Sequence, residues 1–264
     1  MNTVLITGGS HGIGFELAKQ FAADGFRLVL VSKPEEELAY AKKILEETYN
    51  VEVVTLAKNL ATAEAALELY KWAKTLDFSI GILVNNAGFG TGGYIIDIEM
   101  ARELEMIQLN VTTVYHLTRL FLQDMVAKDS GKIMNVASIA AFQPSPALST
   151  YAATKAFVFS FTTAIAYELR QAKSKVHIMA LCPPPAHTGF QAAAKLENSK
   201  LFESFSVVSA KQIARQGYRA FMKGKTWIIP DALVNFVVEA GNRFFPFWLK
   251  MKITYNTLTK GRMF

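Results

Sequence analysis

Three residues in the middle of the chain have the types and the spacing for acid–base chemistry on an oxygen atom. Tyr151 and Lys155 are four residues apart, and Ser138 follows the apolar run Lys132–Ala137. Positions i and i+4 share one helix face, so the Lys155 ammonium would lower the phenol pKa of Tyr151 from about 10 toward the working pH. Ser138 would hydrogen-bond the same substrate oxygen, and the trio predicts carbonyl/alcohol redox chemistry. A Tyr-x-x-x-Lys spacing also occurs on ordinary solvated helices, so this prediction depends on the rest of the chain.

A glycine-rich loop near the N-terminus provides the strongest support. The apolar run Thr3–Thr7 leads into Gly8-Gly9-Ser10-His11-Gly12-Ile13-Gly14, and a helical pattern follows. Glycines let the backbone turn tightly and approach a pyrophosphate, while the helix N-terminus offers N–H groups to phosphate oxygens. The order of strand, loop and helix predicts a dinucleotide site.

The elements that would position these residues alternate along the chain. Strands are expected at Thr3–Thr7, Arg27–Val31, Val51–Leu56, Ile80–Val84, Lys132–Ala137, Val176–Leu181 and Lys225–Ile229, with helices at Pro34–Tyr49 and Thr62–Thr75 among those between them. Strands that alternate with helices predict a parallel sheet with right-handed crossovers. We therefore expect an α/β Rossmann fold, with residues 1–264 as one NADP(H)-binding domain and a doubly wound sheet flanked by helices.

Four motifs in this order resemble the classical short-chain dehydrogenase/reductase family over essentially the whole length. Thr7–Gly14 has the family's Thr-Gly-x-x-x-Gly-x-Gly form, and Asn85-Asn86-Ala87-Gly88 matches its Asn-Asn-Ala-Gly segment. Asn110, Ser138, Tyr151 and Lys155 match its four catalytic positions. The stretch Cys182–Thr188 falls where the family carries a Pro-Gly-x-x-x-Thr-like loop, although Pro184 replaces the glycine.

The resemblance implies a role for each of these residues. Tyr151 would be the general acid in reduction, Ser138 would hold the substrate oxygen, and Lys155 would bind the nicotinamide ribose. Asn110 would kink its helix and hold a water in the proton relay. The expected cofactor-binding residues are Gly8, Ser10, His11, Gly12, Ile13, Gly14, Ser32, Lys33, Asn59, Leu60, Asn86, Ala87, Gly88, Tyr151, Lys155, Pro183, Ala186 and Thr188.

The end of the second expected strand indicates which nicotinamide cofactor is used. An acid there would bond the ribose 2′-hydroxyl of NAD, whereas a hydroxyl and a cation would accept a 2′-phosphate. This chain has Ser32 and Lys33, and His11 is a further potential donor in the glycine loop. The sequence therefore predicts NADP(H).

Cysteine usage and hydropathy indicate the cellular compartment of the protein. The single cysteine, Cys182, excludes an internal disulfide, fits a reducing compartment and is expected to be a packing residue. No metal-ligand spacing, signal peptide or membrane-length apolar run is visible, so we expect no metal and a cytoplasmic location. The apolar helix Ala156–Ala166 is expected, by resemblance, to pack against a second subunit in a homodimer or homotetramer.

The net charge of +6 is concentrated in the tail, residues 241–264, which has five cations, no acid and many aromatic residues. Without this tail the chain is nearly neutral, which argues against nucleic-acid binding. The tail would either lie on a membrane surface or cover the substrate cleft or a subunit contact. The sequence favours the second interpretation.

The substrate is the least constrained part of the prediction. Residues 188–207 contain several Phe and Leu and are expected to form a lid, and Phe89, Phe142 and Leu148 would line the pocket. An apolar pocket favours a hydrophobic ketone such as a steroid, a lipid-like carbonyl or a 3-oxoacyl thioester. The main hypothesis is an NADPH-dependent carbonyl reductase; the alternative is a catalytically silent NADP(H)-binding redox sensor or scaffold.

Overall fold

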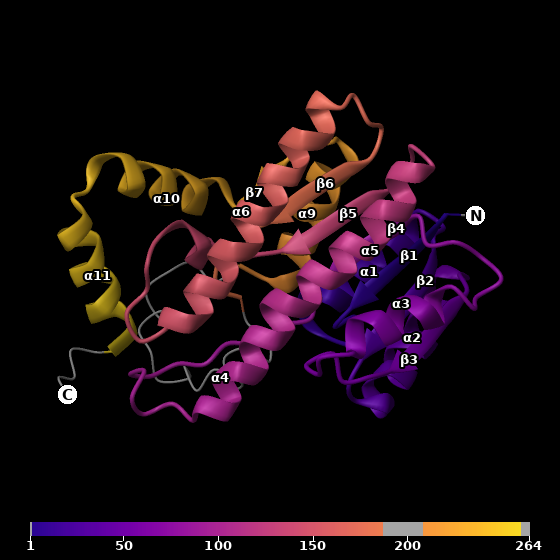
Figure 1. Cartoon of the computed structure of the whole chain (residues 1–264), viewed down its shortest axis with the longest axis horizontal. Coiled ribbons are helices and arrows are strands. Elements are labelled where there is room, and N and C mark those ends of the chain that lie inside the picture. Colours follow the sequence, from indigo (N-terminus) through magenta and orange to yellow (C-terminus); the bar gives the residue numbers. More distant parts are fainter. Residues whose placement is uncertain (1, 187–207, 260–264) are drawn as a thin grey trace.

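The computed structural model describes residues 2–186 and 208–259 and has three layers, with a parallel sheet between two layers of helices (Figure 1). The sheet has seven strands in the order β3-β2-β1-β4-β5-β6-β7. This confirms the predicted doubly wound α/β Rossmann fold. The strands are β1 (Thr3–Thr7), β2 (Arg27–Ser32), β3 (Val53–Ala57), β4 (Ile82–Asn85), β5 (Lys132–Val136), β6 (His177–Leu181) and β7 (Trp227–Ile228).

The helices cover both faces of this sheet. Side chains alternate along a strand, so Val4 and Ile6 of β1 enter one core while Leu5 enters the other. The first core is covered by α1 (Gly12–Ala23), α2 (Glu35–Tyr49) and α9 (Ala210–Met222), and the second by α3 (Ala65–Ala73), α5 (Val114–Ala127) and α6 (Ser149–Gln171). Burial on both faces explains why the strands read as continuous apolar runs.

Several predicted boundaries are wrong by a few residues. The third strand begins at Val53 and not at Val51, and the helix predicted at Thr62–Thr75 covers Ala65–Ala73 because a turn precedes it, with the Ala65 N–H bonded to the Thr62 carbonyl. The last strand is Trp227–Ile228 instead of Lys225–Ile229. It is an edge strand that pairs only with Ala180 and Leu181 of β6.

The carboxyl ends of the strands meet at one edge of the sheet because all pairings are parallel. Chain order reverses between β1 and β4, which places the loops after these two strands side by side. Such a switch point is where doubly wound folds bind their ligands.

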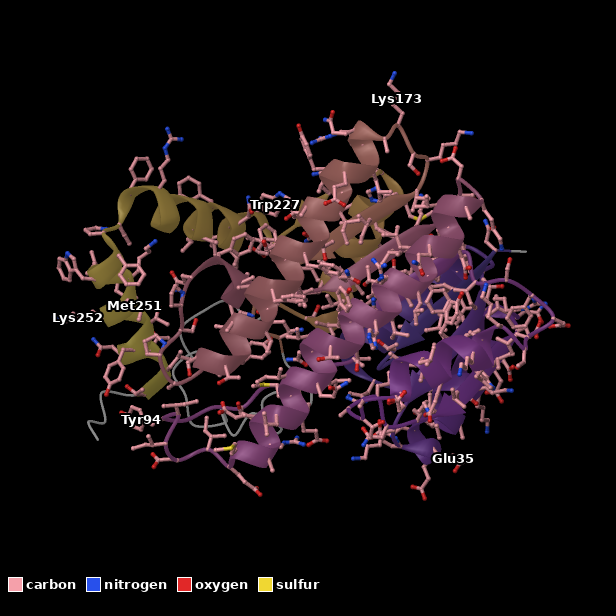
Figure 2. The ribbon with its side chains drawn as sticks, viewed as in Figure 1. Glu35, Tyr94, Lys173, Trp227, Met251 and Lys252 are labelled. Carbon is pink, nitrogen blue, oxygen red and sulfur yellow. The ribbon has the colours of Figure 1, made fainter. Side chains whose placement is uncertain are left out.

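The C-terminal arm, defined here as α10 (Ala232–Phe244) and α11 (Phe247–Thr259), leaves the sheet and turns back toward the catalytic region (Figure 1). Two hydrogen bonds of 2.8 Å hold α11 in place, one between the hydroxyls of Tyr94 and Tyr255 and one from the Gln143 amide to Thr254. Leu258 is buried in a cluster with Tyr151. Figure 2 shows Lys252 of the arm at the left edge of the molecule and Glu35 of α2 at its lower edge, right of centre.

Candidate active site

The glycine loop is fastened to the loop after β4. The Asn86 side-chain amide donates to the carbonyls of Thr7 (3.0 Å) and Gly8 (2.9 Å), and the Thr7 hydroxyl accepts from the N–H groups of Asn86 and Ala87, each at 3.0 Å. Gly8 has a φ of 64°, a conformation that favours glycine. The motifs Thr7–Gly14 and Asn85–Gly88 therefore form one rigid unit.

The start of α1 packs against this unit. A Cβ atom on Gly14 would overlap the Gly8 carbonyl oxygen and the Asn86 amide, so only glycine allows this approach. His11 stands at the N-cap and gives no side-chain hydrogen bond to the first turn. Uncapped N–H groups at a helix N-terminus form an anion site, which is the chemistry that a pyrophosphate requires.

The residues predicted to take part in proton transfer lie in the segment after β5 and in α6. Ser138 follows β5 and caps the short 3₁₀ helix η2 (Ile139–Phe142), accepting a 3.1 Å hydrogen bond from the Ala140 N–H. Tyr151 lies in the first turn of α6, and its side chain hydrogen-bonds that of Ser138. One turn later, Lys155 donates to the Val136 carbonyl at 2.9 Å. The structure thus brings together the three residues from which the chemistry was predicted.

Asn110 links the two halves of the site. It lies in η1 (Gln108–Thr113), a π-helical segment between α4 (Met100–Ile107) and α5. Its amide group donates to the Phe89 carbonyl (2.9 Å) and to the Thr154 hydroxyl (3.2 Å) while its oxygen accepts from the Phe89 N–H (3.2 Å). A Cβ atom on Gly88 would lie 2.8 Å from the Asn110 oxygen, so this contact also requires a glycine.

The predicted direction of the phenol pKa is wrong. Burial raises the pKa of Tyr151 to about 12, and the hydrogen bond with Ser138 opposes this only in part. Burial also lowers the pKa of Lys155 to about 8. The Lys155 ammonium lies 5.8 Å from the centroid of the Tyr151 ring. At neutral pH the phenol therefore keeps its proton and is ready to donate it.

A cleft of about 400 Å³ runs from the glycine loop and the end of β2 to the catalytic residues. Ser10 and Asn110 are buried and, like Gly14, lie outside its lining, while Thr188 and the predicted lid at 188–207 lie outside the described residues. The cleft contains most of the predicted cofactor residues: Gly8, His11, Gly12, Ile13, Ser32, Lys33, Asn59, Leu60, Asn86, Ala87, Gly88, Tyr151, Lys155, Pro183 and Ala186.

The sequence analysis missed Glu37 at one end of this cleft. Its carboxylate accepts hydrogen bonds from Ser10 (3.0 Å) and lies 2.9 Å from the His11 ring nitrogen Nδ1. The Ser10 and Ser32 hydroxyl oxygens lie 3.0 Å apart, within hydrogen-bond distance. The sequence feature that could have indicated this contact is the position of Glu37 in the first turn of the helix after β2. Glu37 does not itself line the cleft, but its carboxylate contacts His11, which does.

A second cavity, of about 250 Å³, shares Ser138 and Tyr151 with the cleft. Phe142 and Leu148 line it as expected, whereas Phe89 lines the first cleft. The sequence did not indicate which tail residues would contribute. The arm and the link between its two helices supply one wall through Val237, Val238, Gly241, Phe245, Lys250, Ile253, Thr254, Thr257 and Leu258.

Other candidate chemistry is limited. Cys182 is buried, and burial raises the pKa of its thiol to about 12, so it is a packing residue and not a thiolate nucleophile. Among residues 2–186 and 208–259, no three His, Cys, Asp or Glu side chains converge as a metal site. None of the helices in these two ranges has both the length and the hydropathy needed to cross a bilayer.

Known proteins resemble this chain in sequence and in structure. The family model for short chain dehydrogenases matches residues 2–199. Very-long-chain 3-oxoacyl-CoA reductase-A of Danio rerio is 36% identical over 171 residues, which cover 63% of this chain and 53% of the relative. Hydroxysteroid dehydrogenase-like protein 1 of Gallus gallus is 30% identical over 212 residues, covering 80% and 62%.

The chain thus spans between about half and three fifths of the length of these two relatives. A short-chain dehydrogenase from Sphingobium yanoikuyae, solved in complex with NADPH, superposes with a TM-score of 0.82 at 28% identity and covers 91% of both chains. The matched range includes the glycine loop, the Asn-Asn-Ala-Gly segment and the four residues predicted to be catalytic. The chain belongs to the classical short-chain dehydrogenase/reductase family of oxidoreductases.

Proposed function

We propose that this protein is an NADPH-dependent reductase of hydrophobic ketones. The observation that carries the proposal is that the cleft and the apolar cavity meet at Ser138 and Tyr151. A cofactor in the cleft and a carbonyl in the cavity would therefore approach each other at the proton donor. The glycine loop fits a dinucleotide, since Gly8 and Gly88 line the cleft and a Cβ atom on Gly8, Gly14 or Gly88 would collide with the segments that form it.

Each polar group of the site has a task in this reaction. When bound, the reduced nicotinamide supplies the hydride that reaches the carbonyl carbon. Tyr151 gives its phenolic proton to the carbonyl oxygen, and Ser138 holds that oxygen by a hydrogen bond. Lys155, held by its hydrogen bond to the Val136 carbonyl, would bind the nicotinamide ribose. Asn110 fixes the loop at Phe89, and so keeps both halves of the cleft in register.

The cavity indicates the substrate class. Its lining is mainly aliphatic and aromatic, with Phe142, Leu148 and Phe245 among the larger side chains. Such a pocket binds an apolar body and leaves the carbonyl to the polar pair at its end. Steroid-like ketones and 3-oxoacyl thioesters fit this description, and the names of the two relatives point the same way.

A substrate panel tests the proposal. Purified protein with NADPH is assayed by loss of absorbance of the reduced nicotinamide, using a steroid ketone, a long-chain 3-oxoacyl thioester and a small polar ketone. We expect kcat/KM to be at least about 100-fold higher for one of the hydrophobic ketones, because burial of an extra apolar body contributes roughly 3 kcal/mol or more. Tight NADPH binding with no turnover of any ketone would favour the alternative, a silent NADP(H)-binding sensor or scaffold.

The choice of NADP(H) is supported by Ser32 and Lys33 at the end of β2, while Glu37 complicates it. Lys33 is exposed at the rim of the cleft, where its ammonium can meet a 2′-phosphate. The Glu37 carboxylate would repel that phosphate unless His11, 2.9 Å away, balances its charge. Lys33 should therefore favour NADPH, and Glu37 should favour NADH.

Exchange of these charges should change the cofactor preference. Ser32→Asp with Lys33→Ala is expected to weaken NADPH binding by about 2–4 kcal/mol and to improve NADH, because a charge-assisted contact is lost and a repulsion is added. Glu37→Gln should shift the preference toward NADPH. The preference is measured as the ratio of the Kd values for NADPH and NADH, each obtained by fluorescence titration. Lys43→Ala, an exposed change on the same helix as Glu37, is the control, and an unchanged preference in all variants would contradict the assignment of the phosphate site.

We also propose that the protein forms a homodimer or homotetramer through α5 and α6. Phe157 of α6 and Tyr115 of α5 are 38% and 37% exposed, and both ring systems contact Phe161 at centroid distances of 5.5 and 5.6 Å. An aromatic cluster on two adjacent helices is typical of a buried contact between subunits.

A further inference from the structure

The turn of the C-terminal arm exposes an unusual run of aromatic side chains. All six residues from Arg243 to Trp248 are exposed. The exposed fractions are 71% for Phe244, 49% for Phe245, 60% for Phe247 and 65% for Trp248. Figure 1 shows this turn at the end of the molecule farthest from β1 to β3. Large aromatic rings exposed together in one segment mark a surface that has a partner.

The exposed apolar surface continues along α10. Leu233 and Phe236 are 64% and 68% exposed, whereas Val234, at 3%, faces the core. Leu233, Phe236 and Phe244 recur at spacings that put them on one face of a helix. α10 therefore has apolar residues on two sides, one packed against the protein and one facing outward. We call the outward side the arm face: Leu233, Phe236, Phe244, Phe247 and Trp248.

Charge indicates what kind of partner the arm face fits. From Arg243 to the last residue the sequence has five cations and no Asp or Glu, and Arg243 and Lys252 are exposed beside the aromatic turn. A second exposed apolar surface, around Ile96 and Met100, is accompanied by the exposed acids Asp97 and Glu99. An anionic surface would attract the first and repel the second.

We propose that the arm face binds the surface of a bilayer that contains anionic phospholipids. The aromatic rings enter the boundary between headgroups and acyl chains, and the cations contact the lipid phosphates. Each helix of the arm has 13 residues and is about 20 Å long, so the arm lies along the surface and does not cross it. The sheet and the cofactor cleft stay outside the lipid.

Vesicle sedimentation tests this proposal with the full chain. Vesicles of phosphatidylcholine with about 30% phosphatidylglycerol are compared with phosphatidylcholine alone, at low salt and at about 0.5 M KCl. We expect binding to the anionic vesicles at low salt, and an apparent Kd at least about tenfold higher in each of the other conditions. Phe244→Ser/Phe247→Ser/Trp248→Ser should lose binding at least about tenfold, and Arg243→Gln/Lys252→Gln should weaken it and flatten its salt dependence.

Matched variants separate this site from general stickiness. Ile96→Ser/Met100→Ser removes exposed apolar side chains from the acidic patch, and Lys211→Gln/Lys223→Gln removes two exposed cations at the ends of α9. Both should bind vesicles like the parent. None of the three aromatic residues lines the catalytic cavity, so the triple variant should keep its turnover of a soluble ketone.

Three results would overturn the proposal. The first is that the folded parent, checked by circular dichroism, does not bind anionic vesicles. The second is that the triple aromatic variant binds as well as the parent. The third is that sedimentation equilibrium shows the triple variant to have lost a subunit contact while vesicle binding is unchanged, which would assign the arm face to a second copy of the chain.

Discussion

Replacement of Tyr151 by Phe is expected to lower kcat by at least about 100-fold, since only the proton that the phenol donates in the transition state is lost. NADPH affinity should change little, because the ring stays in its cluster with Leu148 and Leu258. Turnover by stopped-flow absorbance and Kd by fluorescence titration measure the two quantities separately. A variant that keeps more than a few per cent of the rate, against the usual worth of an acid catalyst, would show that another group donates the proton.

Tyr218→Phe is the matched control for this experiment. The Tyr218 hydroxyl donates to Asp24, far from the cleft, and the side chain is buried. Loss of this hydrogen bond should lower the free energy of unfolding by only about 0.5–1.5 kcal/mol, because Asp24 is exposed and water can replace the phenol. The turnover of the folded control should equal that of the parent, so the comparison distinguishes a lost catalytic proton from a general loss of packing.

Replacement of Gly14 by Ala should abolish measurable NADPH binding. The new methyl group would overlap the Gly8 carbonyl oxygen and the Asn86 amide, and both belong to the rigid unit that forms the cradle. Relief of this overlap requires α1 to move away from the glycine loop. This movement should lower the free energy of unfolding by about 1–3 kcal/mol or more. Thermal unfolding with and without NADPH measures both effects, and we expect a lower Tm and no stabilisation by the cofactor.

Gly81→Ala provides the comparison. A Cβ atom there would meet only the Thr3 carbonyl oxygen, at 3.8 Å, which is ordinary contact. We expect its Tm and its NADPH-dependent stabilisation to match those of the parent. If Gly14→Ala bound NADPH normally while folded, the close approach at Gly14 would not be a requirement of the site.

The sequence predicts those parts of the fold and site that depend on local patterns. Apolar runs mark buried parallel strands, and the glycine loop is readable because a tight turn and a close approach both require glycine. The catalytic set is readable because Tyr151 and Lys155 share a helix. Glu37 was missed because its contact with Ser10 and His11 joins residues 26 or 27 positions apart, and no short spacing reveals such a contact.

The error in the phenol pKa has a similar origin. Spacing along a helix shows that a lysine and a tyrosine share a face, but it does not show how deeply that face is buried. In the structure both side chains are less than a tenth exposed, and the Lys155 ammonium is bonded to the Val136 carbonyl. Desolvation then raises the pKa of Tyr151 and lowers the pKa of Lys155.

From the sequence, membrane contact and cover of the substrate cleft are alternative roles for the tail, because composition does not show which side of a helix each residue occupies. In the structure, the residues suited to each role lie on different sides of the arm. Leu258 and Thr254 face the catalytic region, whereas Phe247 and Trp248 face outward. One segment can therefore line the cavity and still present an apolar, basic surface to a partner.

The central place of β1 in the sheet has a consequence for how the protein is made. The first strand to leave the ribosome gains its second neighbour, β4, only when residues 82–85 have followed it, and the Asn86 clamp on Thr7 and Gly8 forms later still. Tyr151 and Lys155 emerge after a further stretch of synthesis that takes at least several seconds at about 5–20 residues per second. During that time a nascent chain has an open apolar strand edge and an incomplete cradle. Because residues as late as Ala186 line the cleft, NADPH can stabilise the protein only after these residues have been made, and until then an open strand edge can pair with other strands.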